Sequence, residues 1–368
     1  MADTTTPTDI DEICRNVLKK SLRVRRGENL IVESWTHMLP WANAFVLEAR
    51  RLGVRTTLLY EDEATYWRSV EACKPADLGR MPDPELGAIA KADAYVFLWG
   101  PEDRPRLAAL PSEQHQALTA YNGRWYEAAA KAHLRGCRME IGRATPPAAR
   151  LHGVSPTAWQ ESLLDASRVD LTALARDGAR LAGRLRKGKR VRLTHANGTD
   201  LELQLARRKP VIDDGIVDAD DVKSGNNVTS FPSGAVYVAV DEQSASGRVV
   251  ANRVSYPGKG PLEGGRWLFA ENRLAEFEYR SGGESFQEAY DAAGVGKERP
   301  GFFSVGLNPK IRVAPGLEDF ERGTILVGIG ANAAFGGKSR AAFQSWLGVA
   351  GAHLEVDGKT LVADGEIL

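Results

Sequence analysis

The sequence predicts an α/β protein with an open, mostly parallel sheet domain at the N-terminus and a curved, antiparallel, β-rich (α+β) domain at the C-terminus. Two observations lead to this fold class. In the first half, short apolar strand patterns alternate with helical patterns, and in the second half alternating strand patterns flank two-residue turn signals. With 368 residues and 43% hydrophobic content, the chain is long enough for two cores.

The predicted organisation has four segments. They are a polar, partly helical lead over 1–19, an α/β domain over 20–155, a helical connector over 156–189, and a β-rich domain over 190–368 that is expected to carry the active-site cleft.

The α/β domain opens with a βαβ unit. Residues 29–34 form an apolar strand pattern, 40–53 have helical spacing with proline near the start and glycine at the end, and 55–62 read as a strand again. A helix end and a buried strand follow over 88–100, which favours a parallel sheet. Because no Gly-x-Gly-x-x-Gly follows these strands, a nucleotide site is only weakly indicated.

Turn signals organise the rest of the chain. After two consecutive helical patterns over 156–187, pairs of strand patterns flank two-residue turns, and one further helix is predicted over 285–294. The four predicted turns are Asn197-Gly198, Ser246-Gly247, Glu271-Asn272 and Asp357-Gly358. They predict one strongly curved antiparallel sheet.

Composition narrows the possible partners and compartment. The 48 basic and 48 acidic residues balance, so the chain lacks the positive footprint of a nucleic-acid binder. Its three cysteines, Cys14, Cys73 and Cys137, are far apart, which suits a reducing compartment. No signal peptide and no apolar run of about 20 residues is present, so we expect a cytoplasmic protein without a membrane partner.

Histidine positions give one candidate for chemistry. His37 follows the first strand pattern and precedes a helix, where open α/β sheets place ligands, although an ordinary packed loop is the simpler interpretation. His195 and His353 belong to strand patterns and are expected to be half-buried sheet residues. The acidic run over 213–221 does not match a calcium loop and is interpreted as solvated, or as a rim that attracts amines.

Four C-terminal segments together resemble a known family. Residues 231–250, 302–309, 323–338 and 354–368, including Pro-Ser-Gly-Ala, Gly-Leu-Asn-Pro and a Gly-Gly-Lys loop, are similar to the aminopeptidase T family of metallo-aminopeptidases, peptidase family M29. The ring-cleaving 2,5-dihydroxypyridine dioxygenase resembles the chain more distantly. The resemblance to the aminopeptidase T family covers nearly the whole chain, and it implies an aminopeptidase T-like pair of domains and a homodimer.

The resemblance also implies that metal ligands are missing. The family holds its metals with side chains from these loops, but the matched positions here are Ala235, Phe302, Leu326, Gln344 and Trp346. Residues 301–351 contain no histidine, and their only acids are Glu318, Asp319 and Glu321, in a predicted surface turn. A catalytic zinc or iron site needs about three His, Cys, Asp or Glu ligands, so we predict that this chain has lost its metal and needs no cofactor.

Polar and aromatic side chains of the same loops are candidates for substrate binding. They are Tyr237, Phe302, Asn308, Asn332, Lys338, Arg340, Gln344 and Trp346. Ligand pockets have such a composition, but the aromatic residues could equally fill the former metal cavity as core. Lys338, Gln344 and His37 are the candidates for catalysis.

The predicted function is that of a divergent aminopeptidase T-like protein. It binds or acts on a peptide or a small amino-group compound in the cleft between its domains by a metal-independent route. Two alternatives stay open: a working metal-dependent leucyl-type aminopeptidase with other ligands, and a ring-cleaving enzyme like the dihydroxypyridine dioxygenase.

Overall fold

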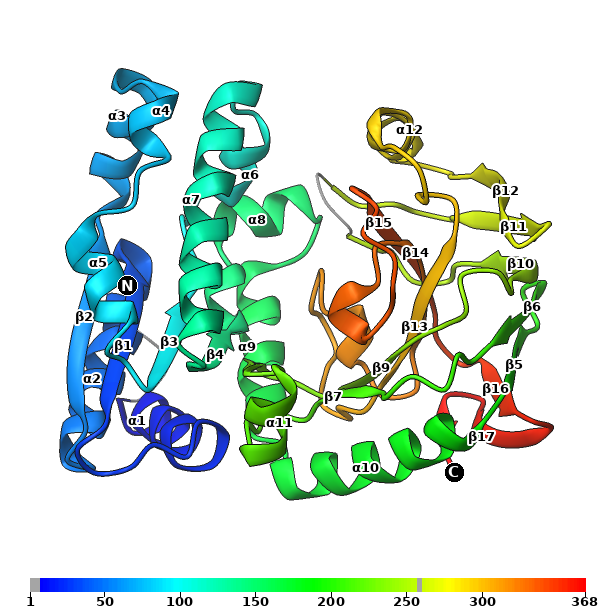
Figure 1. Cartoon of the computed structure of the whole chain (residues 1–368), viewed down its shortest axis with the longest axis horizontal. Helices are drawn as coiled ribbons and strands as arrows, with labels where there is room; N and C mark the ends of the chain where they lie inside the picture. Colours follow the sequence, from blue (N-terminus) through cyan, green and yellow to red (C-terminus); the bar gives the residue numbers. More distant parts are fainter. Residues whose placement is uncertain (1–6, 257–259) are drawn as a thin grey trace. The chain divides into compact units, whose positions relative to one another are not determined.

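The computed structural model describes residues 7–256 and 260–368 (Figure 1). The chain divides into two compact units. Unit 1 comprises Met1–Arg168 and Gly215–Pro232, and unit 2 comprises Val169–Asp214 and Ser233–Leu368. The predicted fold class is confirmed, because unit 1 contains a parallel sheet and unit 2 contains antiparallel sheets.

Unit 1 is built on a five-stranded parallel sheet in the order β2-β1-β3-β4-β8. Its strands are β1 (Asn29–Trp35), β2 (Arg55–Glu61), β3 (Ala94–Leu98), β4 (Arg135–Met139) and β8 (Val228–Phe231). After β1 the chain adds β2 on one side and then β3 on the other, so the winding reverses at β1. In open parallel sheets, ligands bind beyond the carboxyl ends of the strands at such a reversal.

Helices cover the sheet of unit 1. Helix α2 (Leu39–Arg51) has proline in its first turn and packs against β1 and β2. Ile31 and Tyr95 of the sheet form a buried cluster with Trp125 of α7 (Ser112–Lys131). The remaining helical segments are α1 (Pro7–Asn16), η1 (Val17–Ser21), η2 (Thr36–Met38), α3 (Glu63–Ala72), α4 (Pro75–Leu78), α5 (Asp83–Ile89), α6 (Arg104–Ala108), η3 (Glu140–Arg143), α8 (Pro146–Leu151), α9 (Pro156–Ser167) and α11 (Ala219–Ser224).

Unit 2 contains two antiparallel sheets where the sequence predicts one. The eight-stranded sheet consists, in spatial order, of β12 (Arg273–Glu278), β11 (Arg266–Ala270), β10 (Ser246–Val250), β6 (Thr199–Gln204), β5 (Arg190–His195), β16 (His353–Val356), β17 (Lys359–Ala363) and β18 (Glu366–Ile367). The five-stranded sheet consists of β15 (Gln344–Val349), β14 (Ile325–Gly330), β13 (Pro300–Gly306), β9 (Ala235–Ala239) and β7 (Val211–Asp213). The helical segments are α10 (Leu171–Lys187), α12 (Gly283–Ala292), η4 (Glu318–Phe320) and η5 (Ala333–Phe335).

Three of the four predicted hairpins are present, and one is wrong. The turns at Asn197-Gly198, Glu271-Asn272 and Asp357-Gly358 join β5 to β6, β11 to β12 and β16 to β17. Strands β9 and β10 do not pair, because β9 belongs to the five-stranded sheet and β10 to the eight-stranded one. Gly247 is not a turn residue. It lies in β10, where a Cβ atom would meet the Asp200 carbonyl oxygen of β6 at 2.2 Å.

No helix that the structure describes combines the length and hydrophobicity needed to cross a lipid bilayer.

Candidate functional site

The positions that the resemblance assigns to metal ligands lie in the five-stranded sheet of unit 2. Ala235, Phe302 and Leu326 are buried there, with exposed fractions of 0%, 3% and 2%. The Phe302 ring contacts Phe335 with a centroid separation of 4.4 Å and occupies the space that a Cβ atom on Gly328 would need. These side chains are apolar and packed, so they do not fit a metal ion, and no catalytic step is assigned to one at these positions.

The remaining candidates of unit 2 fall into separate groups. Tyr237 stacks on Phe335 at 4.8 Å and donates a hydrogen bond to Asp319. Trp346 lies in β15 opposite Gly328, which in turn lies opposite Phe302. Gln344 donates to the Ala331 carbonyl and lines a pocket of about 280 Å³ whose walls include Leu262, Phe286 and Phe343.

The two candidate asparagines have structural roles. Asn308 is fully buried and donates to the Ser233 carbonyl at 2.9 Å. Asn332, also fully buried, donates to Glu242 and to the Gly301 carbonyl and accepts from the Ser339 amide. Lys338 and Arg340 extend from the same loop and are exposed.

The sequence predicts that residues 315–323 form a surface turn, and the structure corrects this prediction. Glu318 is only 8% exposed and accepts from the Gly316 amide, and Asp319 accepts from Tyr237. Glu321 pairs with Arg253 at 2.8 Å. These acids bind partners within unit 2 because η4 packs against β13 and β14, which the local sequence did not reveal.

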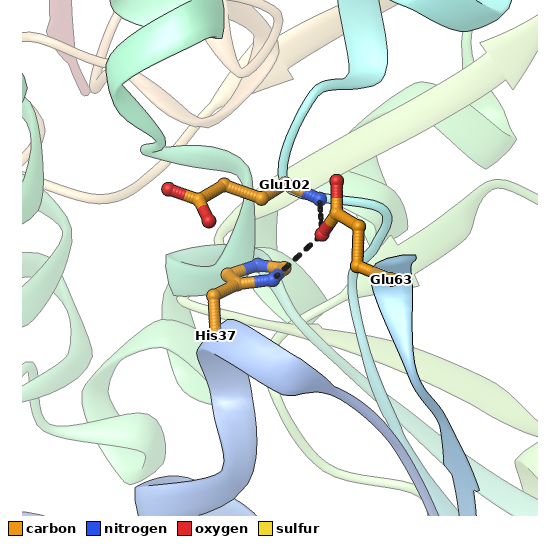
Figure 2. A group of neighbouring side chains, drawn as sticks. All are labelled: His37, Glu63 and Glu102. Carbon is orange, nitrogen blue, oxygen red and sulfur yellow. Dashed lines mark hydrogen bonds and ion pairs between the residues drawn. The ribbon is translucent and has the colours of Figure 1, made fainter. Parts of the chain in front are cut away.

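A cluster of polar side chains lies at the winding reversal of the unit 1 sheet. His37 stands two residues after β1, Glu63 two residues after β2, and Glu102 four residues after β3. Since these strands are neighbours in the order β2-β1-β3, their carboxyl ends bring the three side chains together. One ligand atom from each residue lies within 4.8 Å of the other two. Figure 2 shows the His37 imidazole below both carboxylates.

Backbone and indole groups position the Glu63 carboxylate. Its Oε1 accepts from the Asp103 amide at 3.0 Å and from Trp67 Nε1 at 3.1 Å. Its Oε2 accepts from the Glu102 amide at 2.8 Å and lies 3.9 Å from His37 Nδ1 (Figure 2). A carboxylate oxygen accepts about two hydrogen bonds, so Oε2 retains one acceptor direction for a ligand.

The imidazole of His37 also has an unused acceptor. Its Nε2 donates to the Gly142 carbonyl at 3.4 Å, which leaves Nδ1 as the basic nitrogen of the neutral ring. Nδ1 is buried and has no hydrogen-bond partner in the described chain. The 3.9 Å between Nδ1 and Glu63 Oε2 is longer than a hydrogen bond. An orphaned buried acceptor facing carboxylates is costly unless a proton donor or a cation is bound there.

Close packing fixes the loop that carries Glu102. Gly100 lies against the Trp35 indole so tightly that a Cβ atom would come within 2.0 Å of the ring. Thr145 donates to the Glu102 carbonyl at 2.7 Å. The Glu102 carboxylate itself takes part in no hydrogen bond or ion pair with residues 7–256 or 260–368, so it is available to a ligand.

His37 is the only one of these three residues that the sequence singled out. Glu63 and Glu102 are ordinary glutamates in polar loops, and the sequence signal that could have found them is their place just after strands predicted to neighbour the His37 strand. Pairing of β1 with both β2 and β3 is what joins them. His195 and His353, by contrast, are sheet residues as predicted: His195 accepts from the Asn197 amide and His353 contacts Asp364.

The chain has a fold similar to that of two solved structures. The structure matches wild-type AmpT from Thermus thermophilus with a TM-score of 0.76 and 17% sequence identity, over 99% of this chain and 100% of AmpT. It also matches 2,5-dihydroxypyridine dioxygenase from Pseudomonas putida KT2440, with a TM-score of 0.64 and 16% identity, over 99% of this chain and 98% of the other. No family model and no curated protein matches the sequence. The predicted resemblance is thus confirmed as a likeness of fold.

Proposed function

We propose that this protein binds and acts on a peptide or a small compound with a free amino group, at His37, Glu63 and Glu102, by a route that does not use the family's metal site. One observation carries the proposal: at the winding reversal of the unit 1 sheet, the orphaned Nδ1 of His37 lies close to Glu63 Oε2, which retains one acceptor direction, and to the Glu102 carboxylate. An ammonium group has three N–H donors, one for each acceptor.

The spacing of the acceptors can be compared with the spacing expected around an ammonium group and around a metal ion. Three acceptors that each lie about 2.8 Å from one tetrahedral nitrogen are about 4.6 Å apart. Three ligands that each lie about 2.1 Å from a metal ion are about 3.4 Å apart. The upper limit of 4.8 Å on the observed separations accommodates both arrangements, and the 3.9 Å between His37 Nδ1 and Glu63 Oε2 lies between the two, so the proposal of an ammonium group rests on the match between its three donors and the acceptors.

The site also supplies a base for the bound amino group. Nδ1 of His37 is placed to accept a proton from the ammonium, which leaves a neutral, nucleophilic amine. Proton transfer from a bound amine is therefore the chemistry assigned to His37.

Binding of L-leucinamide, which carries an amino group and no carboxylate, tests this proposal. In calorimetry with excess chelator, we expect Glu102→Gln to weaken binding at least tenfold, because it removes a charge but keeps the size of the side chain. The exposed Glu113 of α7 provides the matched control, Glu113→Gln, with unchanged affinity. Equal affinity of wild type and Glu102→Gln would contradict the proposal, as would no binding at all.

A divalent metal at the same three residues is the second candidate, in which case the protein is a metal-dependent hydrolase. The orphaned Nδ1 favours it, since imidazole and carboxylates are ligands for zinc, cobalt and iron, but the donors must move closer together. Elemental analysis after incubation with each of these metals distinguishes the two. One equivalent of metal in the wild type that is lost in His37→Ala, together with aminoacyl-amide hydrolysis that a chelator abolishes, would support the hydrolase.

A homodimer and a cytoplasmic location remain parts of the proposal. The dimer rests on the resemblance alone, and light scattering of the purified protein tests it. Cys14, Cys73 and Cys137 form no disulfide, which supports a reducing compartment.

A further inference from the structure

A second charged feature lies beside the amino-group site in unit 1. Arg104 begins α6, two residues after Glu102, and its guanidinium stacks on the Trp99 indole with 4.3 Å from Cζ to the ring centroid. Its Nη1 is shielded from solvent and has no hydrogen-bond partner in the described chain. A guanidinium has five donors and binds carboxylates through two of them, so this half-buried guanidinium, with a shielded nitrogen that lacks an acceptor, is suited to an anion.

A second arginine increases the positive charge at this place. The Arg143 guanidinium lies 5.3 Å from the centroid of the same Trp99 ring. Arg143 forms an ion pair with Glu140 at 3.2 Å, so the Glu140 charge already has a partner. Two guanidinium groups therefore lie around one indole, and both contribute positive charge there.

Two neighbouring ionisable groups respond to this charge. Burial, and then the charge of Arg143, lower the pKa of Arg104 to about 10. Burial, and then the charges of Arg143 and Arg104, lower the pKa of His152 to about 4. Both directions are those expected for groups that are shielded from solvent near cations, and a bound anion would oppose them.

The cationic pair and the amino-group site are parts of the same loops. Arg104 is two residues from Glu102, so their Cα atoms are at most about 7.6 Å apart. Arg143 follows Gly142, whose carbonyl accepts from His37. Gly142 itself packs on the Trp99 backbone, where a Cβ atom would be only 3.0 Å from the nearest atom. The backbone positions that carry the two groups of side chains are thus adjacent at both places.

We propose that Arg104, supported by Trp99 and Arg143, binds the carboxylate of a ligand whose amino group lies at His37, Glu63 and Glu102. The substrate class is then a small zwitterion, a free amino acid or a dipeptide. The binding site for the amino group rests on the proposed function, whereas the binding site for the carboxylate rests on Arg104 alone.

Three probes of one side chain separate the two halves by calorimetry on the full chain. L-leucine carries both charges, L-leucinamide only the ammonium, and N-acetyl-L-leucine only the carboxylate. We expect wild type to bind L-leucine at least tenfold more tightly than either other probe. Arg104→Gln should weaken L-leucine and N-acetyl-L-leucine at least tenfold and leave L-leucinamide within twofold.

A matched control lies on the same short helix. Arg106 also stacks on a tryptophan, Trp67, at 4.2 Å, but it pairs with Glu71. Arg106→Gln should leave the affinity for all three probes unchanged. Arg104→Gln should also raise the melting temperature of the ligand-free protein, because it removes an unpaired buried charge, whereas a purely structural arginine would lower it.

The outcomes distinguish failure of this inference from failure of the proposed function. If L-leucinamide binds as tightly as L-leucine, or Arg104→Gln binds N-acetyl-L-leucine like wild type, the carboxylate site is wrong and the amino-group site stands. If N-acetyl-L-leucine binds through Arg104 and L-leucinamide does not bind, the proposed function fails instead. If Arg104→Gln does not fold, the affinities of the wild type for the three probes test the carboxylate site instead. A second variant, Arg104→Lys, keeps the positive charge but loses the paired N–H donors of the guanidinium, so it should still weaken L-leucine binding.

Discussion

Phe302 occupies a position where the aminopeptidase T resemblance implies a metal ligand, and its surroundings explain why a carboxylate or an imidazole would be unsuitable there. The ring lies against Phe335 and fills the space above Gly328. An ionised side chain in such a place has no partner and is strongly disfavoured. The structure thus gives Phe302 a packing role, and the loss of metal ligands stays a prediction from the sequence.

Truncation of Phe302 should therefore cost stability. We expect Phe302→Ala to lower the free energy of unfolding by about 3–5 kcal/mol, because it leaves a cavity in a buried sheet. Phe302→Leu should cost clearly less. Urea unfolding followed by tryptophan fluorescence measures both, and a loss below about 1 kcal/mol for Phe302→Ala would show that the ring is not core.

Gly328 should be coupled to Phe302. A Cβ atom on Gly328 would meet the Phe302 ring at 2.2 Å, so Gly328→Ala is expected to cost about 1–3 kcal/mol by overpacking. The smaller side chain of Phe302→Leu should relieve part of this cost in the double variant. Strictly additive losses in the double-mutant cycle would contradict direct packing between these residues.

The loop over 332–338 shows, at the scale of an element, why a glycine-rich sequence need not bind a ligand. A Cβ atom on Gly337 would lie 2.0 Å from the Asn332 side-chain amide, so the glycine makes room for the protein's own asparagine. Glu242 holds the loop by accepting from Asn332 at 2.9 Å and from the Lys338 amide at 3.1 Å. Arg208 in turn binds Glu242 at 2.6 Å.

This network should stabilise the loop in a pH-dependent way. Burial raises the pKa of Glu242, but hydrogen bonds from Arg208, Asn332 and Lys338 outweigh it and lower the pKa to about 2. A lowered pKa means that the stabilisation is complete above the ordinary value of 4.5 and is lost as the pH falls towards about 2. The melting temperature of wild type should exceed that of Glu242→Gln at neutral pH, and the difference should shrink below about pH 4.5.

Hydrogen exchange provides an independent measurement of the same element. Amides over 332–338 should exchange faster in Glu242→Gln at neutral pH, while those of β5, in the other sheet of unit 2, should not change. Exchange that is equally fast throughout unit 2 would mean that Glu242 supports the whole unit and not the loop.

For the whole molecule, the interleaving of the two units is the feature that most affects stability. Strand β8 comes about 90 residues after β4 and still pairs with it along Gly136–Met139. Without β8, the β4 edge of the parallel sheet would present unpaired backbone groups. The domain limits predicted from the sequence stay a prediction, since they were drawn without this strand.

A fragment experiment tests the contribution of β8. A chain of residues 1–168 should aggregate or melt at a lower temperature than the same chain with residues 215–232 appended through a flexible linker. The comparison is made by thermal melts and size-exclusion chromatography. Equal stability of the two fragments would show that β8 is dispensable for the sheet.

Thiol reactivity is a second property of the whole chain. Cys73 is exposed, whereas Cys14 and Cys137 are buried, and burial raises the pKa of Cys14. One equivalent of a thiol reagent should react quickly in the native protein and three after denaturation. Cys73→Ser should abolish the fast phase, and a residual fast phase would show that a buried thiol is accessible.

Much of the fold could be predicted because local patterns determine it. The apolar strand of 29–34 and the turns Asn197-Gly198 and Asp357-Gly358 carry their structure in a few adjacent residues. Strand β8 was missed because its four residues have no local signal and pair only with a distant strand. The Ser246-Gly247 turn was wrong because glycine there serves close strand packing, which has the same sequence appearance as a turn.

The candidate site was only partly predictable for the same reason. The rule on strand ends selected His37, but Glu63 and Glu102 gain meaning only from the pairing of three strands. Arg104 gave no signal in the sequence at all, because its lack of an acceptor is a property of the folded loop. The candidates in unit 2 came from the resemblance, and their roles in binding remain untested predictions.

The late position of β8 has a consequence for synthesis on the ribosome. Domains generally fold as units in the order in which they emerge. Here the first sheet is incomplete until Phe231 has emerged, by which time α10, β5, β6 and β7 of unit 2 have already been translated. The β4 edge of the parallel sheet therefore stays unpaired in the nascent chain while the first elements of unit 2 are synthesised. A chaperone that shields unpaired sheet edges would act on this protein during translation.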